Sequence, residues 1–198
     1  MNHHFQCQCG ALKGLVSEPH RALRGMCYCK DCRAYSNHLG STHFTHDSQG
    51  GAEFVATLAK HVTFHEGTQH LACMSLSKAG LLRWYASCCR TPIANTARNW
   101  KLPYVGLLGS CLRTDPEAFE RSFPRLHMRV NTGSAKETPP SLVFGTVVSL
   151  MGFMPRVMLS GVDGTYKQTP FFASPAGEPT VQVVVLSEAE RKHAYSAA

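Results

Sequence analysis

The chain has 198 residues, enough for one globular domain with a sizeable core, and its 43% hydrophobic content is ordinary for such a domain. A formal net charge of +7 first suggests an acidic partner such as nucleic acid. The basic residues are scattered, however, and no basic run is longer than Arg191-Lys192. We therefore expect no nucleic-acid binding.

Nine cysteines are the most informative feature of the composition. The count is odd, and residues 1–5 contain no basic region leading into an apolar stretch, so we do not expect a secreted disulfide scaffold. Five of the nine cysteines lie in C-x-C or C-x-x-C spacing, which favours metal binding in a reducing compartment. The composition thus predicts a cytoplasmic metalloprotein.

Residues 5–16 alternate loosely between apolar and polar side chains, as a strand or hairpin interrupted by Gly10 and Gly14 would. Cys7 and Cys9 would then face the same side, because alternate residues of a strand share a face. Such a pair supplies half of a tetrahedral metal site, so its partners must come from elsewhere in the chain.

The stretch 27–32 (Cys-Tyr-Cys-Lys-Asp-Cys) is the one around which we expect the chain to be organised. A short strand would deliver Cys27 and Cys29 on one side, and the C-x-x-C turn would bring Cys32 back toward the same point. Three converging thiolates suit a soft divalent metal and leave one tetrahedral position open, as in catalytic zinc sites. Residues 33–39 would follow as one or two helical turns, whose dipole favours a thiolate at their start.

The middle of the chain holds the second pair of neighbouring cysteines. Residues 41–60 are rich in Ser, Thr, Gly and Asp and predict an irregular excursion. Beyond them, Gly and polar breaks separate predicted strands at residues 61–65, 70–73, 81–87 and 104–108. The last residues of the aromatic strand 81–87 lead into Cys88 and Cys89, which could complete the site of the first pair. Cys73 and Cys111 stand alone in apolar segments and are predicted to be core residues.

The last third of the chain contains two patterns typical of helix starts. Thr114 and Glu117 form a capping box that predicts a short helix through about residue 123. Ser187 and Glu190 form a second capping box, which follows a predicted strand at 180–186 and predicts a C-terminal helix.

The longest apolar run covers about 13 residues, 142–154, and stops at Pro155-Arg156. A membrane span needs about 18 residues, so we expect no membrane contact. We predict instead a buried helix that packs on the sheet or on a second copy of the chain, which makes a homodimer worth testing.

Cysteine spacing favours zinc over an iron–sulfur cluster, because the ferredoxin run C-x2-C-x2-C-x3-C-P is absent. Thiolate ligands alone do not settle the metal, so iron stays an alternative. His38, His43 and His46 lie close in sequence to residues 27–32, but exposed loop histidines are common and we expect none of them to be a ligand. Seven zinc-bound thiolates and two zinc ions would add −7 and +4 to the formal charge of +7, giving about +4.

The ordered motifs resemble the glutathione-dependent formaldehyde-activating enzyme family, which also includes the centromere protein V domain. That family has an early C-x-C followed by Gly, then C-x-C-x-x-C, then a later cysteine pair that ends in C-G-T-P. The counterparts here are residues 7–10, 27–32 and 89–92.

The resemblance covers residues 5–110 and implies a zinc-containing β-tent of antiparallel sheets. We therefore expect a mainly β fold of the α+β class, with a few short helices in the C-terminal third. Residues 1–114 would form the zinc-binding β domain, and residues 115–198 an extension packed on the same domain.

The resemblance also implies two zinc sites. The structural site would be held by Cys7, Cys9, Cys88 and Cys89, and the catalytic site by Cys27, Cys29 and Cys32. Two departures from the family pattern matter. Ala86 takes the place of the first cysteine of the later pair, so that joint ligation by adjacent Cys88 and Cys89 demands a tight turn, and Arg90 replaces the Gly of C-G-T-P.

The resemblance implies an enzyme of carbon–sulfur bond chemistry, a lyase that joins glutathione or another thiol to a small aldehyde or releases it. A three-thiolate zinc site carries a net charge of −1 and is suited to holding a further thiolate. Arg33, Arg90, Arg98 and Lys101 are candidates for binding the carboxylates of the thiol. One alternative is a non-catalytic binding module stabilised by zinc, and another is thiol redox activity of the paired cysteines.

Overall fold

The computed structural model describes residues 2–140 and 142–196. The strands of this part of the chain are β1 (Asn2–Gln6), β2 (Lys13–Ser17), β3 (Leu23–Cys27), β4 (Ala52–Leu58), β5 (Val62–Glu66), β6 (Leu71–Ser75), β7 (Leu82–Ala86), β8 (Thr91–Thr96), β9 (Tyr104–Leu108), β10 (Leu126–Val130), β11 (Phe172–Ala173), β12 (Glu178–Pro179) and β13 (Val183–Val185). The α-helices are α1 (Lys30–Leu39), α2 (Thr42–Thr45), α3 (Gly109–Leu112), α4 (Pro116–Ser122), α5 (Val143–Val162) and α6 (Glu188–Ser196). Short 3-10 helices lie at Pro19–Arg21, Ala59–His61, Thr68–His70, Thr132–Ser134 and Thr165–Lys167.

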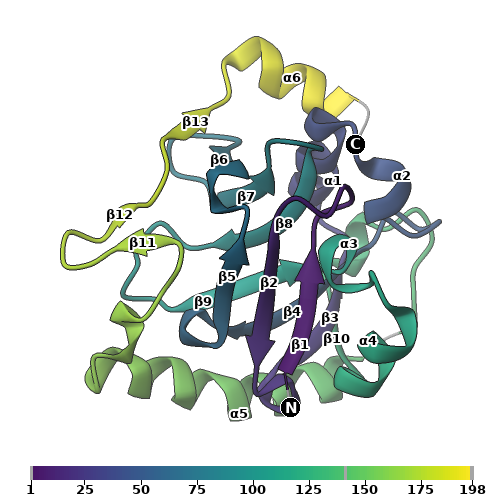
Figure 1. Cartoon of the computed structure of the whole chain (residues 1–198). Coiled ribbons are helices and arrows are strands. Elements are labelled where there is room, and N and C mark those ends of the chain that lie inside the picture. Colours follow the sequence, from purple (N-terminus) through teal and green to yellow (C-terminus); the bar gives the residue numbers. More distant parts are fainter. Residues whose placement is uncertain (1, 141, 197–198) are drawn as a thin grey trace.

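An eight-stranded sheet forms the body of the molecule, with the strand order β10-β3-β4-β9-β8-β7-β6-β13. A three-stranded sheet, β1-β2-β5, lies over it, and β11 and β12 form a separate ribbon (Figure 1). The large sheet is antiparallel except at its two edges, where β10 runs parallel to β3 and β13 runs parallel to β6. The prediction of a mainly β, α+β fold is confirmed, and strands from the C-terminal third complete both edges of the large sheet.

The main core lies between the small sheet and one face of the large sheet. Phe5 from the small sheet, Trp84 from the large one and Phe171 from the C-terminal third are all at most 1% exposed. The Trp84 indole N–H donates to the Thr96 hydroxyl at 2.9 Å, so its buried donor is satisfied. Cys73 and Cys111 are buried in this core, as predicted.

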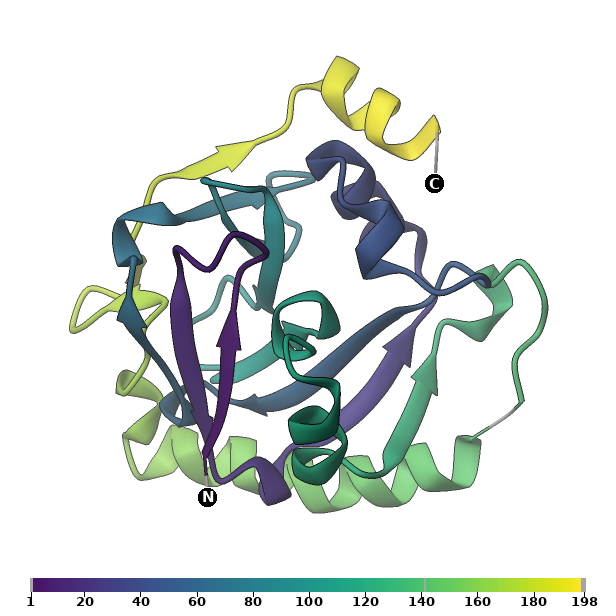
Figure 2. The ribbon, with the colours of Figure 1, turned by 45° about the vertical axis from the view of Figure 1, so that its right-hand side comes forward.

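Helix α1 is present where one or two helical turns were predicted, but it begins at Lys30, inside the stretch 27–32 and three residues earlier than predicted. Helix α6 packs on it at the top of the molecule (Figure 2). The predicted capping box at the start of α6 is confirmed. The Ser187 N–H donates to Glu190 Oε2 at 2.8 Å, and the Glu190 N–H donates back to Ser187 Oγ at 3.3 Å. At α4 the prediction was one residue off. Asp115, not Thr114, caps the helix by accepting from the Ala118 N–H at 3.0 Å.

The expectation of an irregular segment over residues 41–60 was wrong for its second half. Residues 52–58 form β4, which pairs with β3 on one side and β9 on the other. Composition misleads here, because the polar turn 47–51 directly precedes an apolar strand and hides it. The strand lies beside Cys27 in the sheet, where Ala52 pairs with Cys27.

The helix predicted at residues 142–154 is present but differs in length and burial. Helix α5 runs for 20 residues and continues through Pro155, which removes one backbone donor without ending the helix. The expectation of a buried element was wrong, because Phe153, Val157 and Ser160 are its only buried side chains among those that the structure describes. Its apolar surface extends beyond the side that the sheet covers, because Val147, Met151 and Met158 are exposed.

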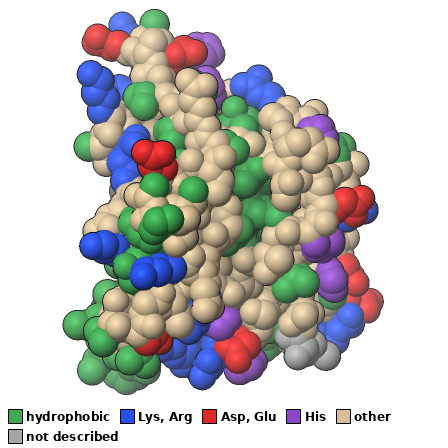
Figure 3. Space-filling view, turned by 60° about the vertical axis from the view of Figure 1, so that its left-hand side comes forward, with side chains coloured by type: hydrophobic (Ala, Val, Ile, Leu, Met, Phe, Trp, Pro, Cys, Tyr) green, Lys and Arg blue, Asp and Glu red, His purple; other side chains and the backbone are tan. Residues whose placement is uncertain are grey.

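In the described residues, α5 is the one helix that is long and apolar enough to cross a membrane, with a mean hydropathy of 1.5 and 17% of that window buried. It lies along the bottom of the molecule (Figure 1), where hydrophobic side chains gather at the surface (Figure 3). The absence of membrane contact was inferred from a run of about 13 residues, shorter than this helix. It stays a prediction.

Candidate metal centres

Cys27, Cys29 and Cys32, which we call the three-thiol group, bring their sulfur atoms together where β3 leads into α1. The Sγ atom of Cys27 lies 3.3 Å from that of Cys29 and 3.7 Å from that of Cys32. Zinc–sulfur bonds of about 2.3 Å in a tetrahedral shell place neighbouring sulfurs about 3.8 Å apart. The spacing in the group therefore fits a zinc ion.

No histidine, carboxylate or further cysteine among residues 2–140 and 142–196 belongs to the three-thiol group. His38, His43 and His46 lie outside it, as expected. Three protein sulfurs therefore converge, one ligand fewer than in a closed tetrahedral shell.

The start of α1 stabilises negative charge on the three-thiol group. Cys29 is the N-cap residue of α1, and its Sγ accepts a hydrogen bond from the Cys32 N–H at 3.3 Å. Asn131 Nδ2 donates to the Sγ of Cys27 at 3.5 Å. Hydrogen bonding with the Cys29 thiol, and then with the Cys32 thiol, lowers the pKa of Cys27 to about 2. The same bonds to Cys27 raise the pKa values of Cys29 and Cys32.

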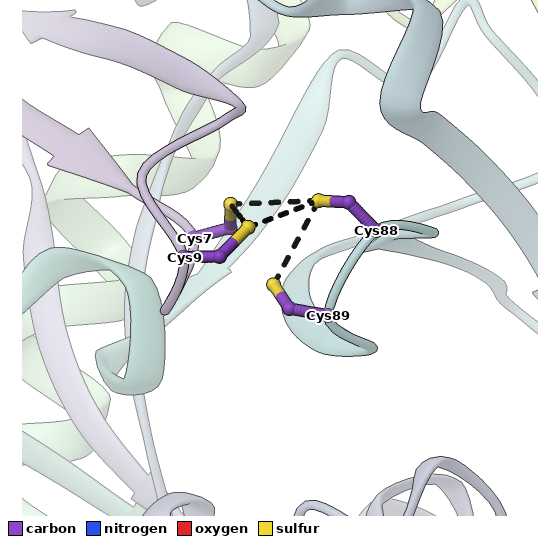
Figure 4. A group of neighbouring side chains, drawn as sticks. All are labelled: Cys7, Cys9, Cys88 and Cys89. Atoms are coloured by element: carbon purple, nitrogen blue, oxygen red, sulfur yellow. Dashed lines mark hydrogen bonds between the residues drawn. The ribbon is translucent and has the colours of Figure 1, made fainter.

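Cys7, Cys9, Cys88 and Cys89 form a second cluster, the four-thiol group (Figure 4). The Sγ atom of Cys88 lies 3.8 Å from Cys7, 3.4 Å from Cys9 and 3.8 Å from Cys89. The sulfurs of Cys7 and Cys9 are 3.5 Å apart. Four sulfurs at these separations fit a closed tetrahedral shell.

A tight turn between β7 and β8 allows the adjacent Cys88 and Cys89 to point to the same place. The Arg90 N–H donates to the Ala86 carbonyl at 2.7 Å, and Arg90 has a φ of 57°, in the left-handed region that glycine favours. This is the position at which the resembling family has its glycine. Arg90 therefore keeps the backbone turn at some conformational cost.

A cavity of about 200 Å³ opens beside the three-thiol group and is lined by all three of its cysteines. Arg83 and Asn95 supply polar groups to its wall, and Arg83 Nη1 donates to Asn95 Oδ1 at 3.2 Å. Arg83 is only 3% exposed, and a buried guanidinium requires nearby negative charge. Asp31 Oδ2 lies 3.9 Å from Arg83 Nη2, and the Cys27 thiolate on the wall of the same cavity supplies further negative charge.

Tyr104 is a further polar side chain at this cavity, which Asp31 and Asn131 also line. Burial, and then negative charge at Cys27 and Cys32, raise the pKa of its hydroxyl, which therefore stays protonated. A Cβ atom at Gly106 would lie 2.7 Å from the hydroxyl oxygen, so that glycine makes room for it. Within the described part of the chain the hydroxyl has no hydrogen-bond partner, which leaves a neutral donor free for a ligand.

A second, larger cavity of about 510 Å³ adjoins the first, and Asp31, Leu81 and Arg83 line both. Its outer wall is α6, which contributes Arg191 and Lys192 together with one acidic residue, Glu188. The Tyr195 hydroxyl holds α6 in this position by donating to Asp31 Oδ1 at 2.6 Å. Basic side chains thus border the approach to the three-thiol group from this side.

Two of the four side chains proposed from the sequence as ligand anchors, Arg33 and Arg90, are engaged elsewhere. Arg33 Nη1 donates to the carbonyls of Tyr28 and Ser134, both at 2.8 Å, and Arg90 Nη2 donates to the His38 carbonyl at 2.8 Å. Neither lines the cavity beside the three-thiol group. Both guanidinium groups are already hydrogen-bonded to backbone carbonyls.

Sequence reasoning missed Arg83 and Tyr104. The signal for Arg83 was a charged residue inside an otherwise apolar, aromatic strand, since lysine and arginine are rarely buried without a functional or electrostatic partner. Tyr104 carried no such signal, because a tyrosine at the start of a strand is ordinary.

The fold and the two cysteine clusters define a mainly β protein with two groups of thiols that could each hold a metal ion. The chain belongs to a family described as a family of unknown function (DUF6151), which matches residues 3–165. That range contains both thiol groups and α5, and ends before α6. No curated protein matches the chain.

Proposed function

We propose that the three-thiol group is a catalytic zinc centre that adds a thiol to an aldehyde or reverses that addition. The main support is that three sulfurs converge beside a cavity. The wall of that cavity holds the buried Arg83 and the Tyr104 hydroxyl, which has no hydrogen-bond partner in the described residues. The resemblance of the cysteine motifs to the glutathione-dependent formaldehyde-activating enzymes supports the same reaction.

Cys27, Cys29 and Cys32 would hold the zinc ion, and the four-thiol group would hold a second, structural one. Zinc bound by three thiolates would keep a substrate thiol deprotonated at neutral pH. The four-thiol group ties the loop after β1 to the turn between β7 and β8, which suits a role in folding.

The side chains around the cavity would bind and orient the two substrates. Arg83 can pair with a carboxylate of the thiol substrate, with Arg191 and Lys192 adding positive charge farther out. These groups favour an anionic thiol, of which glutathione is one example. The thiol would therefore enter from the α6 side.

The reaction itself is a balanced addition. A carbon–sulfur bond forms between the thiolate sulfur and the carbonyl carbon, and the carbonyl π electrons move to the oxygen. The oxygen takes up a proton, which the Tyr104 hydroxyl, a neutral donor in the cavity wall, would supply. The proton lost by the thiol returns through solvent to the Tyr104 oxygen, so that protons balance. No oxidant or reductant is required.

Comparing wild type with Cys29→Ser tests the proposal. Serine can still cap α1, so the helix should persist while the metal at the three-thiol group is lost. We expect about two metal ions per chain in wild type and one in the variant, with S-hydroxyalkyl thiol formation reduced to background. Equal turnover with and without the cysteine would remove the catalytic claim and leave a zinc-stabilised binding module.

A further inference from the structure

A third cavity, of about 310 Å³, lies between α5 and the large sheet. Its lining is apolar throughout except for one hydroxyl, that of Tyr104. The lining residues are Leu23, Phe54, Ala56, Leu102, Tyr104, Met128, Val130, Leu150, Phe153, Met154 and Val157. A volume of this size is at the lower end of the range for small-molecule sites.

Strand register places this apolar cavity on the same face of the sheet as the three-thiol group. Cys27 lies opposite Val130, and two residues back along β3 Gly25 lies opposite both Met128 and Phe54. Directly paired residues of neighbouring strands share a face. The face that carries Cys27 at one end therefore carries the apolar cavity toward the other.

The two cavities share part of their walls. Phe54, Tyr104 and Val130 line both the apolar cavity and the cavity beside the three-thiol group. The Tyr104 hydroxyl thus belongs to the boundary between an apolar compartment and the sulfur atoms. A molecule with one polar, reactive end and an apolar tail would match this division.

Helix α5 forms the outer wall of the apolar cavity. Phe153 and Val157 anchor the helix in a small core with Ala56 and Leu58. Met154, which is 45% exposed, lies at the rim. The cavity is therefore preformed and open at its edge, so a ligand could enter without unfolding the helix.

We propose that the apolar cavity holds the tail of the aldehyde substrate, with the carbonyl carbon at the three-thiol group. This proposal rests on the proposed function and narrows the substrate to aldehydes with an apolar aliphatic or aromatic tail. A polar thiol would approach from the α6 side, and the apolar aldehyde from the α5 side. The two would meet beside Tyr104 and Arg83.

Binding of unreactive alcohols tests the cavity separately from the chemistry. Titration calorimetry with 1-butanol, 1-hexanol and 1-octanol should give dissociation constants that fall about fourfold per added methylene until the cavity is full. Met154→Trp, which fills the cavity, should weaken 1-octanol binding at least tenfold. Met151→Trp is the matched control, because Met151 is 71% exposed, lies on the same helix and does not line the cavity. It should bind like wild type.

Leu102→Trp fills the same cavity from the loop before β9 and serves as the second variant if Met154→Trp fails to fold. Affinity that does not depend on chain length, or equal affinity in wild type and folded cavity variants, would overturn the proposal. A third outcome would also overturn it: wild type binds no alcohol, and Met154→Trp changes the sedimentation coefficient. That result would show that a second copy of the chain covers the cavity.

Turnover separates this inference from the proposed function. In wild type, kcat/KM should rise at least tenfold from propanal to hexanal, and Met154→Trp should reduce that ratio to about one. Cys29→Ser should abolish turnover of both aldehydes while alcohol binding persists. Turnover that is equal for propanal and hexanal would overturn the tail proposal alone. Alcohol binding without any aldehyde turnover would overturn the proposed function, and with it the assignment of the tail to an aldehyde.

Discussion

Replacing Tyr104 with phenylalanine removes one oxygen atom at the place where the cavities meet. The hydroxyl has no hydrogen-bond partner in the described residues, and its pKa is raised by burial and by the negative charge of the three-thiol group. It therefore acts as a protonated donor over the accessible pH range. The substitution tests whether that donor serves the reaction or only fills space.

The structure predicts a small effect of Tyr104→Phe on stability and a large effect on catalysis. Because Tyr104→Phe leaves no protein acceptor unsatisfied, the free energy of unfolding should change by less than about 1 kcal/mol. A positioned proton donor contributes about 10²-fold or more to rate, so kcat/KM should fall by about 10²-fold, which equals about 2.7 kcal/mol of transition-state stabilisation.

The assay pairs urea denaturation with steady-state formation of the S-hydroxyalkyl thiol. Binding of 1-octanol serves as a control, since Tyr104→Phe keeps the ring that lines the apolar cavity. Full activity in the variant would refute the role of the hydroxyl as proton donor. Equal losses of stability and activity would show that the hydroxyl is structural and that the cavity reasoning at this residue is wrong.

Three further predictions concern stability. Gly25→Ala should destabilise the fold by about 1–3 kcal/mol, because its Cβ would lie 2.6 Å from Phe54 Cζ and 2.7 Å from Met128 Cγ. Gly152→Ala on α5, where a Cβ meets nothing within 4 Å, should stabilise by about 0.5–1 kcal/mol in the same urea titration. Burial lowers the pKa of His3, so the unfolded chain takes up a proton that the folded chain does not. Stability should therefore fall as pH drops below the ordinary histidine pKa of 6.5, with a shallower slope in His3→Gln. An unchanged slope would contradict the assignment to His3.

The thiol groups were predictable from the sequence because their geometry is local. The C-x-x-C at the start of α1 fixes the directions of the Cys29 and Cys32 sulfurs within one helical turn, and Cys27 ends β3 just before it. The first C-x-C was predicted on a strand but lies in the loop after β1, so the prediction that a shared strand face aligns Cys7 and Cys9 was wrong. The meeting of Cys7 and Cys9 with Cys88 and Cys89 joins segments far apart in the chain, and here the resemblance to a known motif order supplied what spacing could not.

The cavity walls were not predictable because they depend on register between distant strands. Tyr104 reaches the three-thiol group only because β9 pairs with β4, which in turn pairs with β3. The prediction that the helix at residues 142–154 is buried failed for a related reason. An apolar run shows that a helix prefers an apolar neighbour, but it does not show whether the fold covers one side of that helix or all of it.

The C-terminal third adds one wall to each side of the candidate site, and the two walls differ in their origin. Helix α5, the apolar wall, lies inside the part of the chain that matches the family, whereas α6, the basic wall, lies beyond residue 165. If the proposed function holds, the apolar half of the substrate is recognised by the matched part of the fold. The anionic thiol is recognised by Arg83 together with a helix added outside it. Removing residues 187–198 should therefore raise the KM for the thiol more than the KM for the aldehyde, because Arg191 and Lys192 line only the cavity on the thiol side.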